Sequence, residues 1–104
     1  MKNKLNIAIV GLGQIGIYLY NELITKKKDI ENKTGRKINI VAISAKNKNK
    51  KRRFKINKNI FFRNPLDILK KRNIDILFEC IGQSDGISKK IVENALKNKI
   101  HVIT

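Results

Sequence analysis

The sequence predicts an α/β fold, a doubly wound parallel sheet with helices on both faces. Three observations support this prediction. Short aliphatic segments alternate with segments of helical periodicity along all 104 residues. The aliphatic segments are apolar at nearly every position, as strands buried on both faces of a parallel sheet are. The connections are long enough for right-handed crossovers, so we expect one domain, residues 1–104, with strand order 3-2-1-4-5.

The first half of the chain is expected to contain two long strands and one helix. Residues 5–10 form the first strand, and a helix should begin at Gln14. This helix is expected to bury a stripe at four-residue spacing, formed by Ile15, Leu19 and Leu23 with Ile24 alongside. Lysines at 26–28 would lie in its last turn. A polar connection with a turn at Gly35 then leads to the second strand, 38–44.

The second half follows a basic loop, residues 45–59, and contains the remaining elements. We expect a short strand at 60–62, a helix at 66–72, a strand at 74–82, a second helix, and a last strand at 100–104. Asn64 is the expected cap of the first helix, and Ser84 or Asp85 of the second. The stripe of the second helix is expected at Ile87, Ile91 and Ala95, with Val92 and Leu96 beside it.

The composition limits the classes of function. A net charge of +16 could attract nucleic acid, but aromatic residues are only 6%, so base stacking has little support. The joint enrichment of Lys, Asn and Ile favours a compositional origin of the charge. A single cysteine, Cys80, excludes an internal disulfide and a multi-cysteine metal site. No signal peptide and no run of about 18 apolar residues is present, so we expect a soluble cytoplasmic protein.

Gly11, Gly13 and Gly16 satisfy the pattern G-x-G-x-x-G between a predicted strand and a predicted helix. This context is typical of Rossmann-like dinucleotide-binding folds. The first glycine permits a tight turn, the second lets a pyrophosphate approach the backbone, and the third lets the helix pack closely on the sheet. The amides at the helix start attract anions, and the nearest carboxylate, Glu22, is two turns away. The sequence therefore predicts a pyrophosphate site at residues 11–16.

The end of the second strand bears on which dinucleotide is bound. NAD-specific folds usually carry a carboxylate there, which holds the ribose 2′-hydroxyl. Here the residues are Ser44, Ala45 and Lys46, and no acid occurs between Glu31 and Asp67. Lys46 is the favoured partner of a 2′-phosphate, so NADP is favoured over NAD. Further candidates are Lys48, Arg52 and Arg53, for which a solvated loop is the simpler interpretation.

The end of the fourth strand is expected to lie near the same ligand. Gly82 would let the backbone approach the nicotinamide ribose, whereas Cys80 is interpreted as a small buried residue and not as a nucleophile. His101, the only histidine, lies in an apolar strand, which favours structural packing. No catalytic residue is assigned from the sequence.

The chain resembles the amino-terminal, NAD(P)-binding domain of homoserine dehydrogenase. The matching segments are NIAIVGLGQIG at 6–16, KTGRKINIVAIS at 33–44, NPLDIL at 64–69, IDILFECIG at 74–82 and ENALKNKIHVIT at 93–104. The resemblance implies an oxidoreductase that interconverts L-homoserine and L-aspartate 4-semialdehyde, in threonine and methionine biosynthesis. It also implies cofactor contacts, listed by position: Gly13, Gln14, Ile15, Ile81, Gly82 and Thr104.

The chain departs from the family in ways that limit this expectation. Gln83 stands where the family usually has Gly, and Lys99-Ile100 where it has Gly-Lys. The family continues with a substrate domain that carries its catalytic residues, so we expect these 104 residues to bind cofactor without turnover unless a second chain completes them. Two alternatives stay open: a free-standing dinucleotide-binding module, and a basic nucleic-acid-binding protein.

Overall fold

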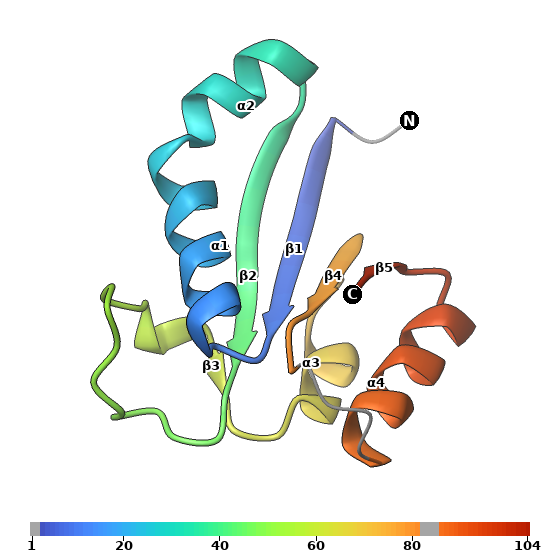
Figure 1. Ribbon diagram of the computed structural model, residues 1–104. Helices are drawn as coiled ribbons and strands as arrows, with labels where there is room; N and C mark the ends of the chain where they lie inside the picture. The colour runs from blue at the N-terminus through green and yellow to red at the C-terminus, as the bar shows by residue number, and fades with distance from the viewer. Residues whose placement is uncertain (1–2, 82–85) are drawn as a thin grey trace.

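A computed structural model describes residues 3–81 and 86–104. In chain order, the elements are β1 (Lys4–Val10), α1 (Gln14–Thr25), α2 (Lys27–Thr34), β2 (Lys37–Ser44), the 3-10 turn η1 (Lys58–Ile60), β3 (Phe61–Phe62), α3 (Leu66–Lys71), β4 (Ile76–Glu79), α4 (Gly86–Lys97) and β5 (His101–Ile103). All strand pairs are parallel, in the order β3-β2-β1-β4-β5 (Figure 1). The predicted fold class and strand order are confirmed.

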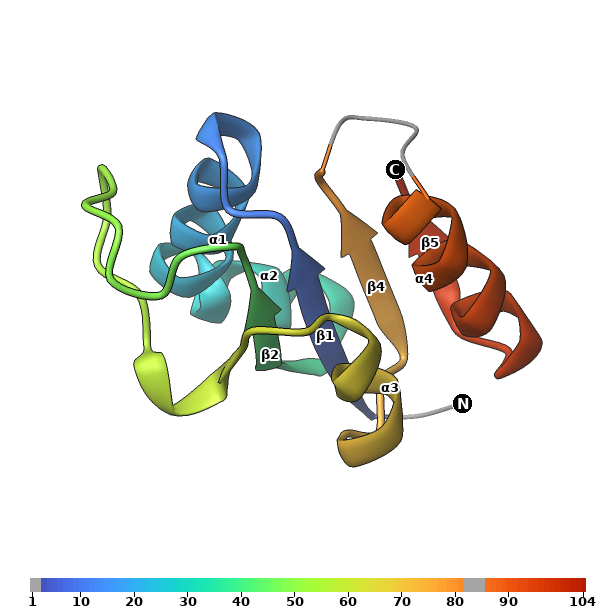
Figure 2. The ribbon, with the colours of Figure 1, turned by 90° about the horizontal axis from the view of Figure 1, so that it is seen from below.

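The central strand β1 is apolar on both faces because a helical layer covers each face. Ile7 and Ile9 pack under α1 and α2, whereas Ala8 and Val10 pack under α3 and α4. Figure 2 shows the two pairs of helices on opposite sides of the sheet. At its carboxyl end β1 is in register with both neighbours, since Val10 lies opposite Ser44 of β2 and Glu79 of β4. The carboxyl ends of three strands therefore meet at one edge.

Helix α1 buries a different face from the one predicted. Ile15 is 77% exposed and Ile24 is 49% exposed, whereas Ile17 and Tyr20 are buried against the sheet. The prediction was wrong because two stripes overlap in this apolar helix. The close contact of Gly16 with the glycine turn determines how α1 is rotated about its axis. The four-residue repeat of apolar residues contains no information about that contact. Leu19 and Leu23 remain at the margin of the core, as partly buried residues.

The predicted polar connection after α1 is also wrong, because it forms the helix α2. Lys26 lies between the two helices, so α1 has no basic residue in its last turn. Helix α2 presents one apolar residue, Ile30, to the core, which is too weak a pattern to reveal a helix. Gly35 ends it in the left-handed conformation, with φ of 71°, and the Glu31 carboxylate accepts a hydrogen bond from the Ile38 amide at 2.9 Å.

The second half agrees with the prediction in order, while several details differ. The Asn64 side chain accepts a hydrogen bond from the Leu66 amide at 3.0 Å, as expected of a cap. In α4, Ile91 and Ala95 are buried as predicted, but Leu96 is 60% exposed and Ile87 turns away from the core. The side chain of His101 is exposed, so the packing role predicted for it is wrong.

The remaining differences concern the ends of the elements. The strands β3, β4 and β5 are shorter than predicted, because apolar residues such as Ile81 and Ile100 flank these strands without belonging to them. Helix α3 ends one residue earlier than predicted, and β1 and β2 each begin one residue earlier. The predicted capping positions 84 and 85 lie outside the described residues. None of the helices within the described ranges is long and apolar enough to cross a membrane.

Candidate functional site

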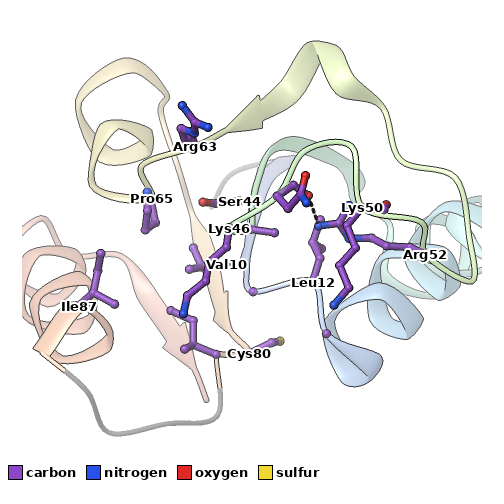
Figure 3. Close-up of a pocket in the computed structure, with 15 residues that line it drawn as sticks. Val10, Leu12, Ser44, Lys46, Lys50, Arg52, Arg63, Pro65, Cys80 and Ile87 are labelled. Atoms are coloured by element: carbon purple, nitrogen blue, oxygen red, sulfur yellow. Dashed lines mark hydrogen bonds between the residues drawn. The ribbon is translucent and has the colours of Figure 1, made fainter.

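A cavity of about 380 Å³ opens at the carboxyl ends of β1 and β2 and beside the segment that follows β4. Figure 3 shows Ile87 and Pro65 on one side of it and Lys50 and Arg52 on the other. At β1 the connections run to opposite ends of the sheet, since β2 lies on one side and β4 on the other. Open α/β sheets bind ligands in the crevice at this switch point. The cavity is therefore the candidate ligand site.

Gly11 makes the turn that leads from β1 into this site. Its φ is +93°, a conformation that residues with a side chain rarely adopt. Its amide donates a hydrogen bond to the carbonyl oxygen of Ser44 at 2.8 Å. A Cβ at Gly11 would lie 2.8 Å from the backbone of Cys80 and Ile81. The turn is thus held against both neighbouring strands, and only glycine fits it.

Gly16 lies behind the turn, in the first part of α1, and is buried. A Cβ at this position would overlap the carbonyl oxygen of Gly11 and would come within 3.4 Å of the Cys80 side chain. Glycine is required here by the close approach of the helix to the turn. Gly16 therefore sets the position of the helix start and does not line the cavity itself.

Gly13 differs from the other two glycines, because no contact with the described residues requires a glycine there. It is the exposed N-cap residue of α1, with φ of −71° and ψ of −160°, which any residue adopts. Apart from atoms of Gly13 and of its two neighbours in the chain, no heavy atom of the described residues lies within 4 Å of the position that its Cβ would take. The first turn of α1 contains no acidic residue, and no side chain caps it. Its first amides therefore face an open space with a positive potential, where an anion can bind.

Four cationic side chains line the cavity, Lys46, Lys50, Arg52 and Arg63, and none of the lining residues that the structure describes is acidic. The Arg52 guanidinium donates hydrogen bonds to the carbonyl oxygens of Asn47 at 2.6 Å and Lys50 at 3.1 Å. Within residues 3–81 and 86–104, the other three cationic groups make no hydrogen bond or ion pair. The site is thus suited to a ligand with several negative charges.

The structure brings together half of the residues predicted to bind the cofactor. Gly11, Gly13, Ser44, Lys46 and Ile81 line the cavity. Among the rest, Gln14, Ile15, Gly16 and Thr104 do not line it, and the side chain of Ile15 is exposed to solvent. The position predicted at Gly82 lies outside the described residues.

Lys50 and Arg63 also line the cavity, and neither is among the residues predicted from the sequence. Arg63 directly follows β3, so the rule that ligands bind beyond the carboxyl ends of parallel strands could have found it. Lys50 carries no such signal, since it is one of many lysines in its loop. The candidates Lys48 and Arg53 do not line the cavity, and the Arg53 guanidinium lies 5.3 Å from the centre of the Phe54 ring.

Cys80 is half-buried just beyond β4, at the wall of the cavity. Burial, and to a lesser extent the charge of Glu79, raises the pKa of its thiol. The Glu79 carboxylate accepts a hydrogen bond from the Ile81 amide at 2.6 Å. His101 lies opposite Ile76, at the amino end of β4, and therefore away from the cavity. Within the described residues, no histidine or cationic group is thus seen to activate the thiol, and its raised pKa disfavours the thiolate that a nucleophile requires.

No three His, Cys, Asp or Glu side chains in the described part of the chain lie together as metal ligands would. A parallel sheet of this order, a glycine turn pinned between strands and an anion-binding helix start define the dinucleotide-binding class of Rossmann domains. Comparison with known proteins agrees. Residues 5–104 match an oxidoreductase family with an NAD-binding Rossmann fold, and the chain belongs to that family.

Three similar proteins are homoserine dehydrogenases. The enzyme of Neisseria gonorrhoeae is 28% identical over 99 residues, which are 95% of this chain and 22% of that protein. A crystal structure of the Staphylococcus aureus enzyme at pH 7.0 superposes with a TM-score of 0.87 at 33% identity, over 97% of this chain and 26% of that one. The Thiobacillus denitrificans enzyme has a TM-score of 0.78 at 25% identity, over 95% and 22%.

The chain thus spans about a quarter of the length of these relatives. The predicted resemblance to the NAD(P)-binding part of homoserine dehydrogenase is confirmed.

Proposed function

We propose that the cavity binds a nicotinamide dinucleotide whose pyrophosphate lies on the first amides of α1, between Gly11 and Gly16. One observation carries this proposal. Gly13 has an ordinary φ, and the space where its side chain would be is open, so neither backbone strain nor packing against the described residues accounts for a glycine there. A ligand that approaches the backbone closely would account for it.

The two halves of the ligand would lie on either side of this turn. The adenosine half would lie over the end of β2, near Ser44 and Lys46, and the nicotinamide half near Ile81 at the end of β4. Gln14 and Ile15 belong to the proposed site through their backbone amides, which are the first of α1. Gly82 belongs to it by its place in the sequence and by the resemblance, and Thr104 by the resemblance alone.

We further propose that NADP is preferred over NAD. The support is the cationic wall on the β2 side, where Lys46 and Lys50 lie and none of the described lining residues is acidic. A ribose 2′-phosphate adds negative charge that such a wall attracts, whereas the carboxylate that usually accepts a 2′-hydroxyl is not found among those residues.

The reaction we propose is that of homoserine dehydrogenase, the interconversion of L-homoserine and L-aspartate 4-semialdehyde in the cytoplasm. When bound, the cofactor supplies the hydride chemistry, and the residues of this chain bind and orient it. Among the described lining residues, none is a histidine or a carboxylic acid that could move a proton for the substrate. The substrate-binding groups would therefore come from outside these residues, in a second chain or a further region. Without them, the chain would act as a dinucleotide-binding module.

Fluorescence titration of the full chain with NADPH and NADH tests the proposal. Gly13→Val should weaken binding of both by about 30-fold or more, because the side chain would occupy the place of the pyrophosphate and remove about 2 kcal/mol of charge-assisted hydrogen bonding. Gly13→Ala should have an intermediate effect. Both variants should melt as cooperatively as the wild type, since the added atoms meet none of the described residues. A folded valine variant that binds NADPH as tightly as the wild type would contradict the assignment.

A further inference from the structure

We infer that Arg52 is a positioning residue, which closes the loop at residues 45–57 and holds Lys46 and Lys50 beside the ligand, and is not itself a phosphate contact. The inference rests on the proposed preference for NADP. It concerns a loop of Lys, Asn and Arg that a sequence of this composition does not predict to be ordered.

The donors of Arg52 are engaged within the loop. One terminal nitrogen donates to the carbonyl oxygen of Asn47 at 2.6 Å, and the other donates to that of Lys50 at 3.1 Å. The planar guanidinium can satisfy two acceptors held at a fixed separation, which a lysine ammonium on a flexible chain does poorly. Arg52 therefore closes a small ring of backbone that contains residues 47–50.

The same segment is ordered by two further contacts. The Asn47 side chain accepts a hydrogen bond from the Asn49 amide at 3.0 Å, and the Lys58 ammonium donates to the Asn49 side chain at 3.1 Å. The Nε atom of Arg52 is buried and has no partner within the described residues. An unpaired buried N–H costs free energy. The two hydrogen bonds of the terminal nitrogens outweigh this cost and keep the guanidinium in place.

The far end of the loop is fastened to the helix that begins at the glycine turn. The Asn57 amide donates a hydrogen bond to the hydroxyl of Tyr20 at 2.9 Å, and Tyr20 is buried in α1. Phe54 and Ile56 pack against the core cluster under this helix. The loop and the proposed pyrophosphate site are therefore parts of one packed unit.

Lys46 directly precedes the ring that Arg52 closes, Lys50 is the last residue of that ring, and both lysines line the cavity. Within the described part of the chain, their ammonium groups make no hydrogen bond or ion pair, so they are available to a ligand. A loop ordered beforehand does not lose conformational entropy when it binds. Loss of the Arg52 contacts should therefore weaken binding of the part of the ligand that meets this loop, which is the 2′-phosphate.

Arg52→Ala and Arg52→Lys, compared in the full chain, test the inference. Both variants should weaken binding of NADPH roughly fivefold to tenfold, and binding of NADH by no more than about twofold. The reason is that about 1 kcal/mol of net stabilisation is lost from the loop alone. The lysine variant decides between the two roles. A positioning arginine is not replaced by lysine, whereas an arginine that contacts phosphate by its charge is largely replaced by it. Arg53→Lys is the matched control, since Arg53 is adjacent and does not line the cavity.

Amide hydrogen exchange gives a second readout that does not depend on ligand. Exchange at residues 47–52 should be faster in both Arg52 variants and unchanged in Arg53→Lys. The inference is overturned if Arg52→Lys binds NADPH like the wild type and its amide exchange at residues 47–52 is unchanged. It is also overturned if both Arg52 variants weaken binding of NADH as much as binding of NADPH. A wild-type chain that binds neither dinucleotide would instead contradict the proposed function, and the exchange measurement would still decide whether Arg52 orders the loop.

Discussion

The glycine turn at residues 11–16 and the basic loop at residues 45–57 border the same cavity, but they are built in different ways. The turn is made of backbone. The segment that follows β4 leaves no room for a side chain at Gly11, and the carbonyl group of Gly11 leaves none at Gly16. The loop is made of side chains, held by a guanidinium and by a tyrosine hydroxyl. We propose that the turn determines whether a dinucleotide binds, and that the loop determines which one.

The largest effect is expected on the packed side of the turn. Gly16→Ala should destabilise the fold by about 3 kcal/mol or more, because its Cβ would overlap the carbonyl oxygen of Gly11 and the helix would have to move. Gly13→Ala is the matched control and should cost about 1 kcal/mol or less, as a substitution at an exposed N-cap. Urea unfolding followed by circular dichroism measures both. Equal losses of stability in the two variants would show that the two sides of the turn do not differ.

A smaller effect, confined to selectivity, is expected in the loop. Lys46→Ala should weaken binding of NADPH about tenfold and leave binding of NADH nearly unchanged, because only the 2′-phosphate would meet this ammonium group. The difference should shrink as salt is raised. Lys48→Ala is the control from the same loop, since Lys48 does not line the cavity. If the two alanine variants have the same effect, the loop acts through its total charge and not through a specific contact.

The smallest effect concerns the thiol under the turn. Because burial and Glu79 raise the pKa of Cys80, the folded protein favours the protonated thiol. The resulting contribution to stability is complete below the pKa of the unfolded state, and it is lost as pH rises through the higher pKa of the folded state. Alkylation at neutral pH should therefore be slower in the native chain than in urea, and its rate should rise only at more alkaline pH. Faster alkylation of the native protein would contradict a half-buried thiol with a raised pKa.

The difference between the turn and the loop also explains what could be predicted from the sequence. Glycine spacing and aliphatic strands report backbone geometry directly, so the strand order and the turn at Gly11 were predicted correctly. The rotation of α1 depends on the close contact at Gly16, and a hydrophobic pattern that included Ile15 gave the wrong face. Helix α2 has too little apolar pattern to be recognised.

Side-chain parts of the site were harder to predict for a related reason. Lys50 and Lys48 are equivalent in the sequence, and only the closed form of the loop places Lys50 at the cavity. The hydrogen bonds of Arg52 that close it join residues of a segment without periodicity, so no repeat reveals them.

The central claim is that the first amides of α1 hold the pyrophosphate. Amide chemical shifts of the ¹⁵N-labelled chain, followed during titration with NADPH, test it most directly. The account predicts the largest shifts at Leu12, Gly13, Gln14 and Ile15, with smaller shifts in the loop at residues 45–57. Saturation with shifts only in the loop, and none at the start of α1, would contradict it.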